Sequence, residues 1–175
     1  MNSAKGLLIV FTGNGKGKTT AALGMSMRAA GHGMKALILQ FIKGLWTYGE
    51  LRSFEKLEEV TIKPIGSGFT WKKENLEEDR RLAKAGWQIA LSELERRYYD
   101  ILVLDELNVV LAYGLLDKMA VVDALEHRTT PSHIVVTGRN APDELIAIAD
   151  LVTEMKEIKH PFRDRGVKAS KGVEF

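Results

Sequence analysis

The chain has 175 residues, of which 45% are apolar and 27% are charged, and its formal net charge is +2. This composition is typical of one globular domain over residues 1–175 and excludes intrinsic disorder, while the absence of cysteine excludes disulfide frameworks, zinc ribbons and iron–sulfur clusters. No apolar run approaches the ~18 residues that span a membrane, and the small charge does not indicate a nucleic-acid partner, so we expect a soluble, cytoplasmic protein.

Short apolar runs alternate with helical patterns along the chain. The apolar runs predict buried strands at 7–11, 36–42, 60–65, 101–104, 134–137 and 151–155. The stretches between them predict helices at 19–30, 50–58, 76–99, 118–127 and 142–149, with Asn75 and Asp117 as N-terminal caps. Residues 156–175 are basic and irregular, which fits either a solvated tail or a segment folded back over a site. The alternation predicts an α/β fold with a mostly parallel sheet, in which ligands bind beyond the carboxyl ends of the strands.

A glycine-rich segment, TGNGKGKTT at residues 12–20, joins the first strand to the first helix. Glycines there let backbone N–H groups turn toward an anion, and Lys18 and Thr19 occupy the positions that contact the outer phosphates and Mg²⁺ in a P-loop. The segment departs from the standard pattern at Thr12, where glycine is usual, and Lys16 adds a second cation. We expect nucleotide binding by Gly13, Asn14, Gly15, Lys16, Gly17, Lys18, Thr19 and Thr20, and a three-layer P-loop NTPase (RecA-like) fold. The alternative, a glycine-rich turn that binds nothing, is disfavoured by the acidic strand end downstream.

That strand end is Asp105-Glu106, which follows the apolar run 101–104. A carboxylate at the end of a buried strand beside a P-loop resembles a Walker B segment, which completes Mg²⁺ coordination with Thr19 and phosphate oxygens. Adjacent side chains on a strand point in opposite directions, so one of the two acids has the alternative role of an exposed turn residue. The spacing alone leaves open whether Asp105 or Glu106 binds the metal.

Two further loops lie at the same predicted edge of the sheet. Arg139, after the strand 134–137, is a candidate for neutralising phosphate charge, and a surface arginine in a turn is an equal alternative. Phe69 and Trp71 stand in a glycine-flanked loop, where they provide either an apolar face for a large flat substrate or two rings packed on the long helix. The base-reading Asn-Lys-x-Asp segment of GTPases is absent.

Taken together, these segments resemble the P-loop type ATP:corrinoid adenosyltransferases. The motifs that carry the resemblance are GNGKGKTT at 13–20, QFIKG at 40–44, GFTW at 68–71, LDEL at 104–107, TGR at 137–139, and Lys159-His160 with GVKA at 166–169. They occur in order over nearly the whole chain, and GNGKGKTT accounts for both Thr12 and Lys16.

The resemblance implies transfer of the 5′-deoxyadenosyl group of ATP to the Co(I) of a reduced corrinoid, cob(I)alamin or a precursor, with release of inorganic triphosphate. It further implies Mg²⁺ as cofactor, with Mn²⁺ as a substitute, a reductase as electron donor, a homodimer, and a role in adenosylcobalamin biosynthesis or salvage. It assigns Lys18 and Arg139 to the phosphates, and Phe69 and Trp71 to the corrin, where they keep cobalt free of a lower ligand. Family members often carry an N-terminal extension that covers the corrinoid; here Met1–Gly6 precede the first strand, so we expect that lid to be absent or supplied by the C-terminal tail.

Two other functions remain open at this level. One is a P-loop kinase or ATPase with Asp105 or Glu106 as base, and the other is a module that binds nucleotide or corrinoid without chemistry.

Overall fold

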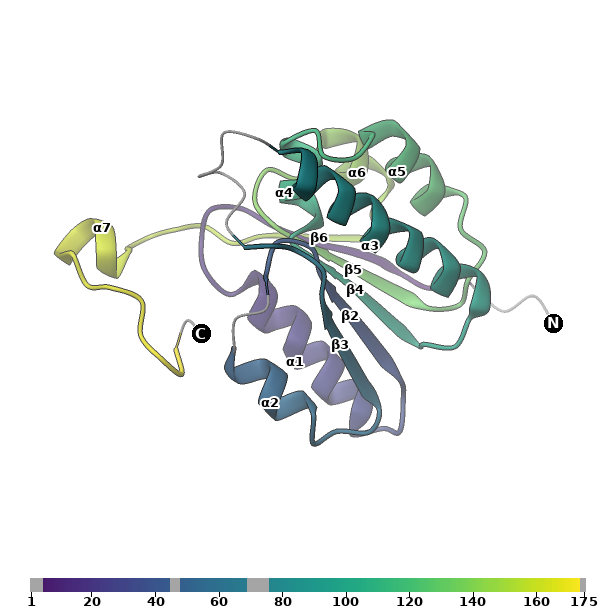
Figure 1. The fold of residues 1–175 in the computed structure, drawn as a ribbon, viewed down its shortest axis with the longest axis horizontal. Coiled ribbons are helices and arrows are strands. Elements are labelled where there is room, and N and C mark those ends of the chain that lie inside the picture. Colours follow the sequence, from purple (N-terminus) through teal and green to yellow (C-terminus); the bar gives the residue numbers. More distant parts are fainter. Residues whose placement is uncertain (1–4, 45–47, 69–75, 174–175) are drawn as a thin grey trace.

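The computed structural model describes residues 5–44, 48–68 and 76–173, and its centre is a six-stranded sheet (Figure 1). The strands are β1 (Leu8–Thr12), β2 (Ala36–Gln40), β3 (Val60–Pro64), β4 (Ile101–Asp105), β5 (His133–Thr137) and β6 (Leu151–Glu154). Their order is β3-β2-β4-β5-β1-β6, and every neighbouring pair is parallel. The predicted α/β fold with a parallel sheet is confirmed.

Helices cover both faces of this sheet (Figure 1). On one face lie α1 (Lys18–Ala30) and α2 (Gly49–Phe54); on the other lie α3 (Glu77–Arg96), α4 (Leu107–Ala112), α5 (Lys118–Glu126) and α6 (Asp143–Ile148). Within the described ranges, none of the helices is long and apolar enough to span a membrane.

The strands are apolar throughout because each one feeds two separate cores. Along β1, Leu8 and Val10 pack with α3 to α6, whereas Ile9 and Phe11 pack with α1 and α2. On α3, Trp87, Ala90 and Leu94 are all buried and belong to the first core. Burial on both faces is the reason that the strands lack the alternation of a half-exposed sheet.

The helix boundaries show where local signals decided the structure and where they did not. Asp117 caps α5 as predicted, because its Oδ1 accepts a hydrogen bond from the backbone N–H of Ala120 (3.0 Å). The long helix ends three residues before the predicted Tyr99, because Arg97 takes a left-handed conformation (φ 55°) that stops it. Asn75, its predicted cap, lies outside the described residues. Two short helices were not predicted: α4, and α7 (Pro161–Arg165) in the tail.

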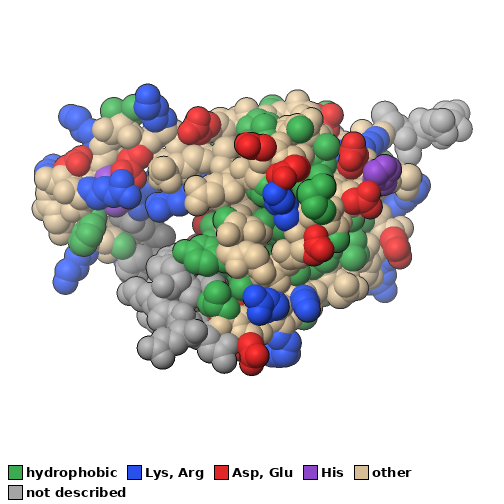
Figure 2. Space-filling view, turned by 90° about the horizontal axis from the view of Figure 1, so that it is seen from above, with side chains coloured by type: hydrophobic (Ala, Val, Ile, Leu, Met, Phe, Trp, Pro, Cys, Tyr) green, Lys and Arg blue, Asp and Glu red, His purple; other side chains and the backbone are tan. Residues whose placement is uncertain are grey.

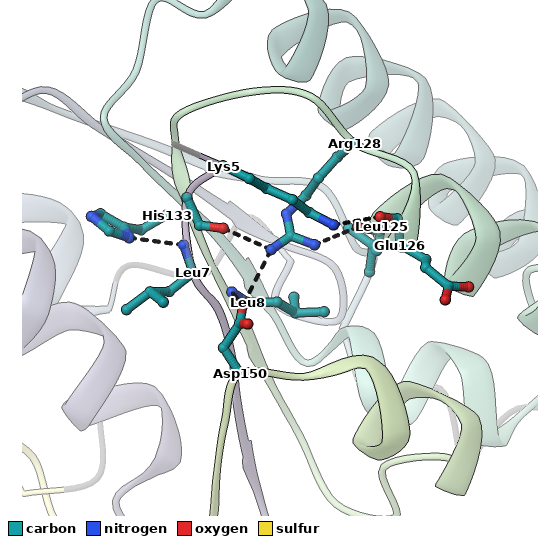
Figure 3. A network of polar contacts seen from close by, with 9 residues as sticks. Lys5, Leu7, Leu8, Leu125, Glu126, Arg128, His133 and Asp150 are labelled. Carbon is teal, nitrogen blue, oxygen red and sulfur yellow. Dashed lines mark hydrogen bonds and ion pairs between the residues drawn. The ribbon is translucent and has the colours of Figure 1, made fainter. Parts of the chain in front are cut away.

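At the amino ends of the strands, the buried guanidinium of Arg128 joins three parts of the chain (Figure 3). It donates to the backbone oxygens of Leu125 and Gly6 and lies 3.5 Å from Asp150 Oδ2. Asp150 in turn accepts from the backbone N–H of Leu8 (2.7 Å). This network fixes the start of β1 at the end of the sheet opposite the glycine-rich loop.

The segment after β6 stands away from the body of the domain (Figure 1). Its side chains are mostly exposed, including Ile158 and Phe162, and Lys and Arg side chains gather on it (Figure 2). The two interpretations of the tail apply to different parts of it. Helix α7 is exposed to solvent, whereas Met155, at the start of the segment, contacts Gly15 of the glycine-rich loop.

Candidate active site

The glycine-rich loop connects β1 to α1 at the carboxyl edge of the sheet. Gly13 and Gly17 have positive φ angles of 91° and 110°. A Cβ atom on Gly13 would lie 2.5 Å from the backbone oxygen of Met155, and one on Gly15 would lie 2.7 Å from it. The backbone N–H of Gly15 donates to that same oxygen at 2.6 Å. The backbone of Met155, just after β6, therefore lies so close to the loop that no side chain fits at these two positions.

Lys18 is the first residue of α1, and it is only 7% exposed. Its Nζ donates to the backbone oxygens of Gly13 and Gly15, both at 2.7 Å. Burial lowers the pKa of the Lys18 ammonium, and Arg139 and Lys16 lower it further by repulsion, against the attraction of nearby carboxylates. A partly desolvated cation at a helix N-terminus, beside a glycine loop, makes this edge a strong site for a phosphate chain.

Asp105, the last residue of β4, is completely buried and lies beside Thr19. Its Oδ1 accepts hydrogen bonds from the hydroxyl groups of Thr19 (2.8 Å) and Thr137 (2.7 Å). Its Oδ2 lies 3.4 Å from Nε2 of Gln40. The strand order places β4 between β2 and β5, which explains why Gln40 of β2 and Thr137 of β5 reach the same carboxylate.

Glu106 follows in a left-handed conformation (φ 64°) immediately before α4. Its backbone N–H donates to the Thr137 hydroxyl at 2.9 Å. Burial and the neighbouring Asp105 raise the pKa of the Glu106 carboxyl to about 7, although Lys18, Lys43 and Arg139 attract the ionised form. The two acids thus occupy different environments, and Asp105 is the one hydrogen-bonded to Thr19.

The residues around Asp105 are suited to a hard cation that arrives with a nucleotide. In the part of the chain that the structure describes, no three His, Cys, Asp or Glu side chains converge to form a cage. The Thr19 hydroxyl and the Asp105 carboxylate are nevertheless 2.8 Å apart, and Mg²⁺ in nucleotide sites commonly takes one or two protein oxygens and completes its shell with phosphate and water. These residues therefore fit an Mg²⁺ ion held jointly with a triphosphate.

Arg139 lies on the turn after β5, between two residues with positive φ angles, Gly138 (129°) and Asn140 (56°). The arginine is exposed, and its charge acts on both Lys18 and Glu106. The structure thus brings Arg139 to the same edge as the glycine loop.

Phe69 and Trp71 lie outside the described residues. The residues that lead into them follow the loop after β2: the backbone N–H of Gly68 donates to the oxygen of Ile42 (3.1 Å), and that of Ile65 donates to the oxygen of Gln40 (2.9 Å). The start of the GFTW segment and the QFIKG segment are therefore side by side.

Comparison with known proteins shows the family to which this chain belongs. The family model described as "ATP:corrinoid adenosyltransferase BtuR/CobO/CobP" matches residues 4–175. A corrinoid adenosyltransferase of Pseudomonas aeruginosa is 45% identical over 98% of this chain and 84% of its own length, and one of Escherichia coli K12 is 42% identical over 98% and 86%. The chain belongs to the ATP:corrinoid adenosyltransferase family. Its activity is the transfer of the adenosyl group of ATP to a corrinoid, and the predicted enzyme class is confirmed.

Solved structures agree with the fold of this adenosyltransferase. The flagellar accessory protein FlaH of Methanocaldococcus jannaschii matches with a TM-score of 0.57 and 11% identity, over 86% of this chain and 71% of that one. The KaiC-like protein PH0186 of Pyrococcus horikoshii matches with a TM-score of 0.52 and 15% identity, over 89% and 75%. At these identities the likeness concerns the fold alone, and it supports the predicted P-loop NTPase architecture.

Three residues at this edge of the sheet were absent from the predicted set. Thr137 and Gln40 contact Asp105, and Met155 closes one side of the glycine loop. Thr137 and Gln40 end apolar strands within the TGR and QFIKG motifs, so their position at strand ends was an available signal. For Met155 the sequence carries no such signal, because its contact is made by the backbone.

Proposed function

We propose that this adenosyltransferase transfers the 5′-deoxyadenosyl group of ATP to the Co(I) of a reduced corrinoid, either cob(I)alamin or a biosynthetic precursor, in adenosylcobalamin biosynthesis or salvage. The observation that supports this most strongly is the meeting of Lys18, Thr19 and Asp105 beside the glycine loop in a chain that matches the family over residues 4–175. We take residues 1–175 as a single catalytic domain.

In the proposed step, the electron pair of Co(I) attacks C5′ of ATP. A cobalt–carbon bond forms, the C5′–O bond breaks, and the oxygen leaves with inorganic triphosphate, while cobalt is formally oxidised to Co(III). Co(I) is a strong nucleophile, so the site needs no general base. The protein has two tasks: to align cobalt with C5′, and to stabilise the charge that develops on the leaving triphosphate.

The glycine loop is suited to the second task. We assign Lys18, Lys16 and Arg139 as the cations that face the phosphates, and the N–H groups of residues 13–20 as further donors. The partly desolvated environment of Lys18 strengthens its attraction for phosphate oxygens. We assign Thr19 and Asp105, with Glu106 nearby, to an Mg²⁺ ion, for which Mn²⁺ is a substitute; when bound, the ion neutralises triphosphate charge.

We assign Phe69 and Trp71 to the corrin. The contact between Gly68 and Ile42 supports this, because the described residues that lead into Phe69 lie beside the end of β2, whose last residue Gln40 contacts Asp105. Trp71→Ala is expected to slow reaction with a corrinoid that carries its lower ligand and to leave ATP binding unchanged, measured by steady-state kinetics and calorimetry. A collapse of ATP affinity would instead make Trp71 a nucleotide-site residue.

We further propose a homodimer in the cytoplasm that receives its electron from a separate reductase. The described part of β6 pairs only with β1, and Leu151 and Val152 on it are 43% and 39% exposed. An exposed apolar edge strand is the kind of surface that a second copy covers. Light scattering coupled to gel filtration tests the dimer, and a mass of one chain at micromolar concentration would refute it.

Isotope labelling tests the proposed step directly. ATP carrying ¹⁸O at the oxygen that bridges C5′ and the α-phosphorus is incubated anaerobically with the enzyme, Mg²⁺ and chemically reduced corrinoid. Attack at C5′ sends the label into inorganic triphosphate. Label retained on an adenosine product would show cleavage at phosphorus, and the proposed step would be wrong.

A further inference from the structure

Gln40 is the last residue of β2, and its side chain is completely buried. Its Nε2 lies 3.4 Å from Oδ2 of Asp105, and its side chain helps to lower the pKa of the Glu50 carboxyl on α2. Its Oε1 is buried and has no hydrogen-bond partner among the described residues. Gln40 is therefore a buried polar side chain at the end of a strand whose other four residues are apolar.

The inventory of donors and acceptors explains this arrangement. A primary amide has two N–H donors on one nitrogen and one acceptor oxygen, whereas ionised carboxylates only accept. The amide nitrogen donates to Asp105, and Glu50 is a second acceptor for it, whereas Oε1 has no donor among the described residues. A buried acceptor without a donor is unfavourable, so its retention points to a donor that arrives with a ligand.

The Glu50 end of this chain of contacts is itself anchored. Burial would raise the pKa of Glu50, but hydrogen bonds from Lys43, from its own backbone and from Gln40 outweigh burial and lower it. Lys43 forms an ion pair with Glu50, and its Nζ lies 4.8 Å from the centre of the Tyr48 ring. Glu50 therefore stays ionised and fixed, and it can hold one N–H of Gln40 in place.

We propose that Gln40 is a positioning residue for the cation of the ATP complex: its N–H groups fix the Asp105 carboxylate to Glu50 on α2, and its Oε1 accepts from a water molecule bound to that cation. The inference rests on the proposed Mg²⁺ site at Thr19 and Asp105. It links that site to the segment between β2 and α2, which lies beside the residues that lead into Phe69.

Calorimetry of ATP binding, with Mg²⁺ and with EDTA, tests the inference without any corrinoid. Gln40→Met keeps the length of the side chain and removes its hydrogen bonds. Mg²⁺ is expected to tighten ATP binding by the wild-type protein. In the variant we expect this tightening to be about 10–100-fold smaller, which is the range for residues that hold metal ligands in place. The affinity for ATP in EDTA should change little. Ser132→Ala is the control, since it removes a buried hydroxyl hydrogen-bonded to Thr130 and Tyr99 at the far end of the sheet. It should leave the Mg²⁺ effect intact.

A second variant separates positioning from a general loss of packing. Glu50→Gln alone should reduce the tightening of ATP binding by Mg²⁺ (the Mg²⁺ effect) by about threefold or more. The double variant should reduce the Mg²⁺ effect no further than Gln40→Met alone, because both substitutions act on one chain of contacts. An unchanged Mg²⁺ effect in both single variants would overturn the inference while leaving the metal site standing. A wild-type protein whose ATP binding ignores Mg²⁺ would overturn the metal site and the inference together.

Discussion

Replacement of Glu106 by glutamine should stabilise the folded chain at alkaline pH, although the residue lies beside the proposed Mg²⁺ site. Burial and the charge of Asp105 raise the pKa of the Glu106 carboxyl from 4.5 to about 7. Between pH 4.5 and about pH 7, the Glu106 carboxyl is therefore protonated in the folded state and ionised in the unfolded state. Stability conferred by that proton is present at low pH and is lost as the pH rises through about 7.

The size of the effect follows from the two pKa values. At about 1.4 kcal/mol per pH unit, ionised Glu106 destabilises the folded state by about 3 kcal/mol above pH 7 and by less than ~1 kcal/mol at pH 5. Glu106 is partly exposed, so solvent screening reduces this difference. We expect the advantage of Glu106→Gln over the wild type to grow by about 1–2.5 kcal/mol between pH 5 and pH 8.

Urea unfolding at pH 5 and pH 8, in EDTA and without nucleotide, measures this difference. Other titrating groups are common to both proteins and cancel. Glu144→Gln serves as a control of opposite sign, because a hydrogen bond from Lys118 lowers the pKa of Glu144, so its removal should give no gain at pH 8. An equal effect of Glu106→Gln at the two pH values would refute the assignment of Glu106 to a buried, charge-repelled position.

Three further predictions concern the glycine loop and the opposite end of the sheet. Lys18→Ala should reduce adenosyl transfer by about 10²–10³-fold or more, measured as single-turnover rate, because the triphosphate loses its main cation; near-normal turnover would contradict the P-loop assignment. Gly15→Ala should lower unfolding stability by about 1–3 kcal/mol and weaken ATP binding, because its Cβ would meet Met155, whereas Gly24→Ala, with open space around it, should be neutral or stabilising. Arg128→Met should lower stability by about 2–4 kcal/mol in urea unfolding, because two backbone carbonyls lose a charged donor, and a loss below 1 kcal/mol would show that the network is not structural.

The sheet and most helices were predictable because their signals are local. Continuous apolar runs marked the strands, and Asp117 marked the start of α5. Helix α4 could not be predicted from the sequence. Its six residues, LNVVLA, are apolar, include two adjacent valines and show no helical period. It forms because Glu106 turns the chain, with its N–H held by Thr137 from the neighbouring strand. That contact spans 31 positions in sequence and exists only once the sheet has formed.

Some features of the candidate site could likewise be predicted from the sequence, and others could not. The loop at 12–20 and the acidic strand end were evident from motif and spacing, because the chemistry demands those residue types in that order. The choice between Asp105 and Glu106 as the partner of Thr19 needed the folded structure, in which Thr19 from α1 and Thr137 from β5 donate to the same oxygen of Asp105. The role of Met155 in shaping the loop depends on the backbone path after β6, which no residue type specifies.

Product stoichiometry tests the central claim most directly. The enzyme is mixed anaerobically with ATP, Mg²⁺ and chemically reduced corrinoid, and the products are separated after one turnover. We predict one adenosylated corrinoid and one intact inorganic triphosphate for each cobalt consumed. Orthophosphate or ADP without alkylated cobalt would indicate an ATPase or kinase, and bound nucleotide without turnover would indicate a binding module; either result would contradict adenosyl transfer at this site.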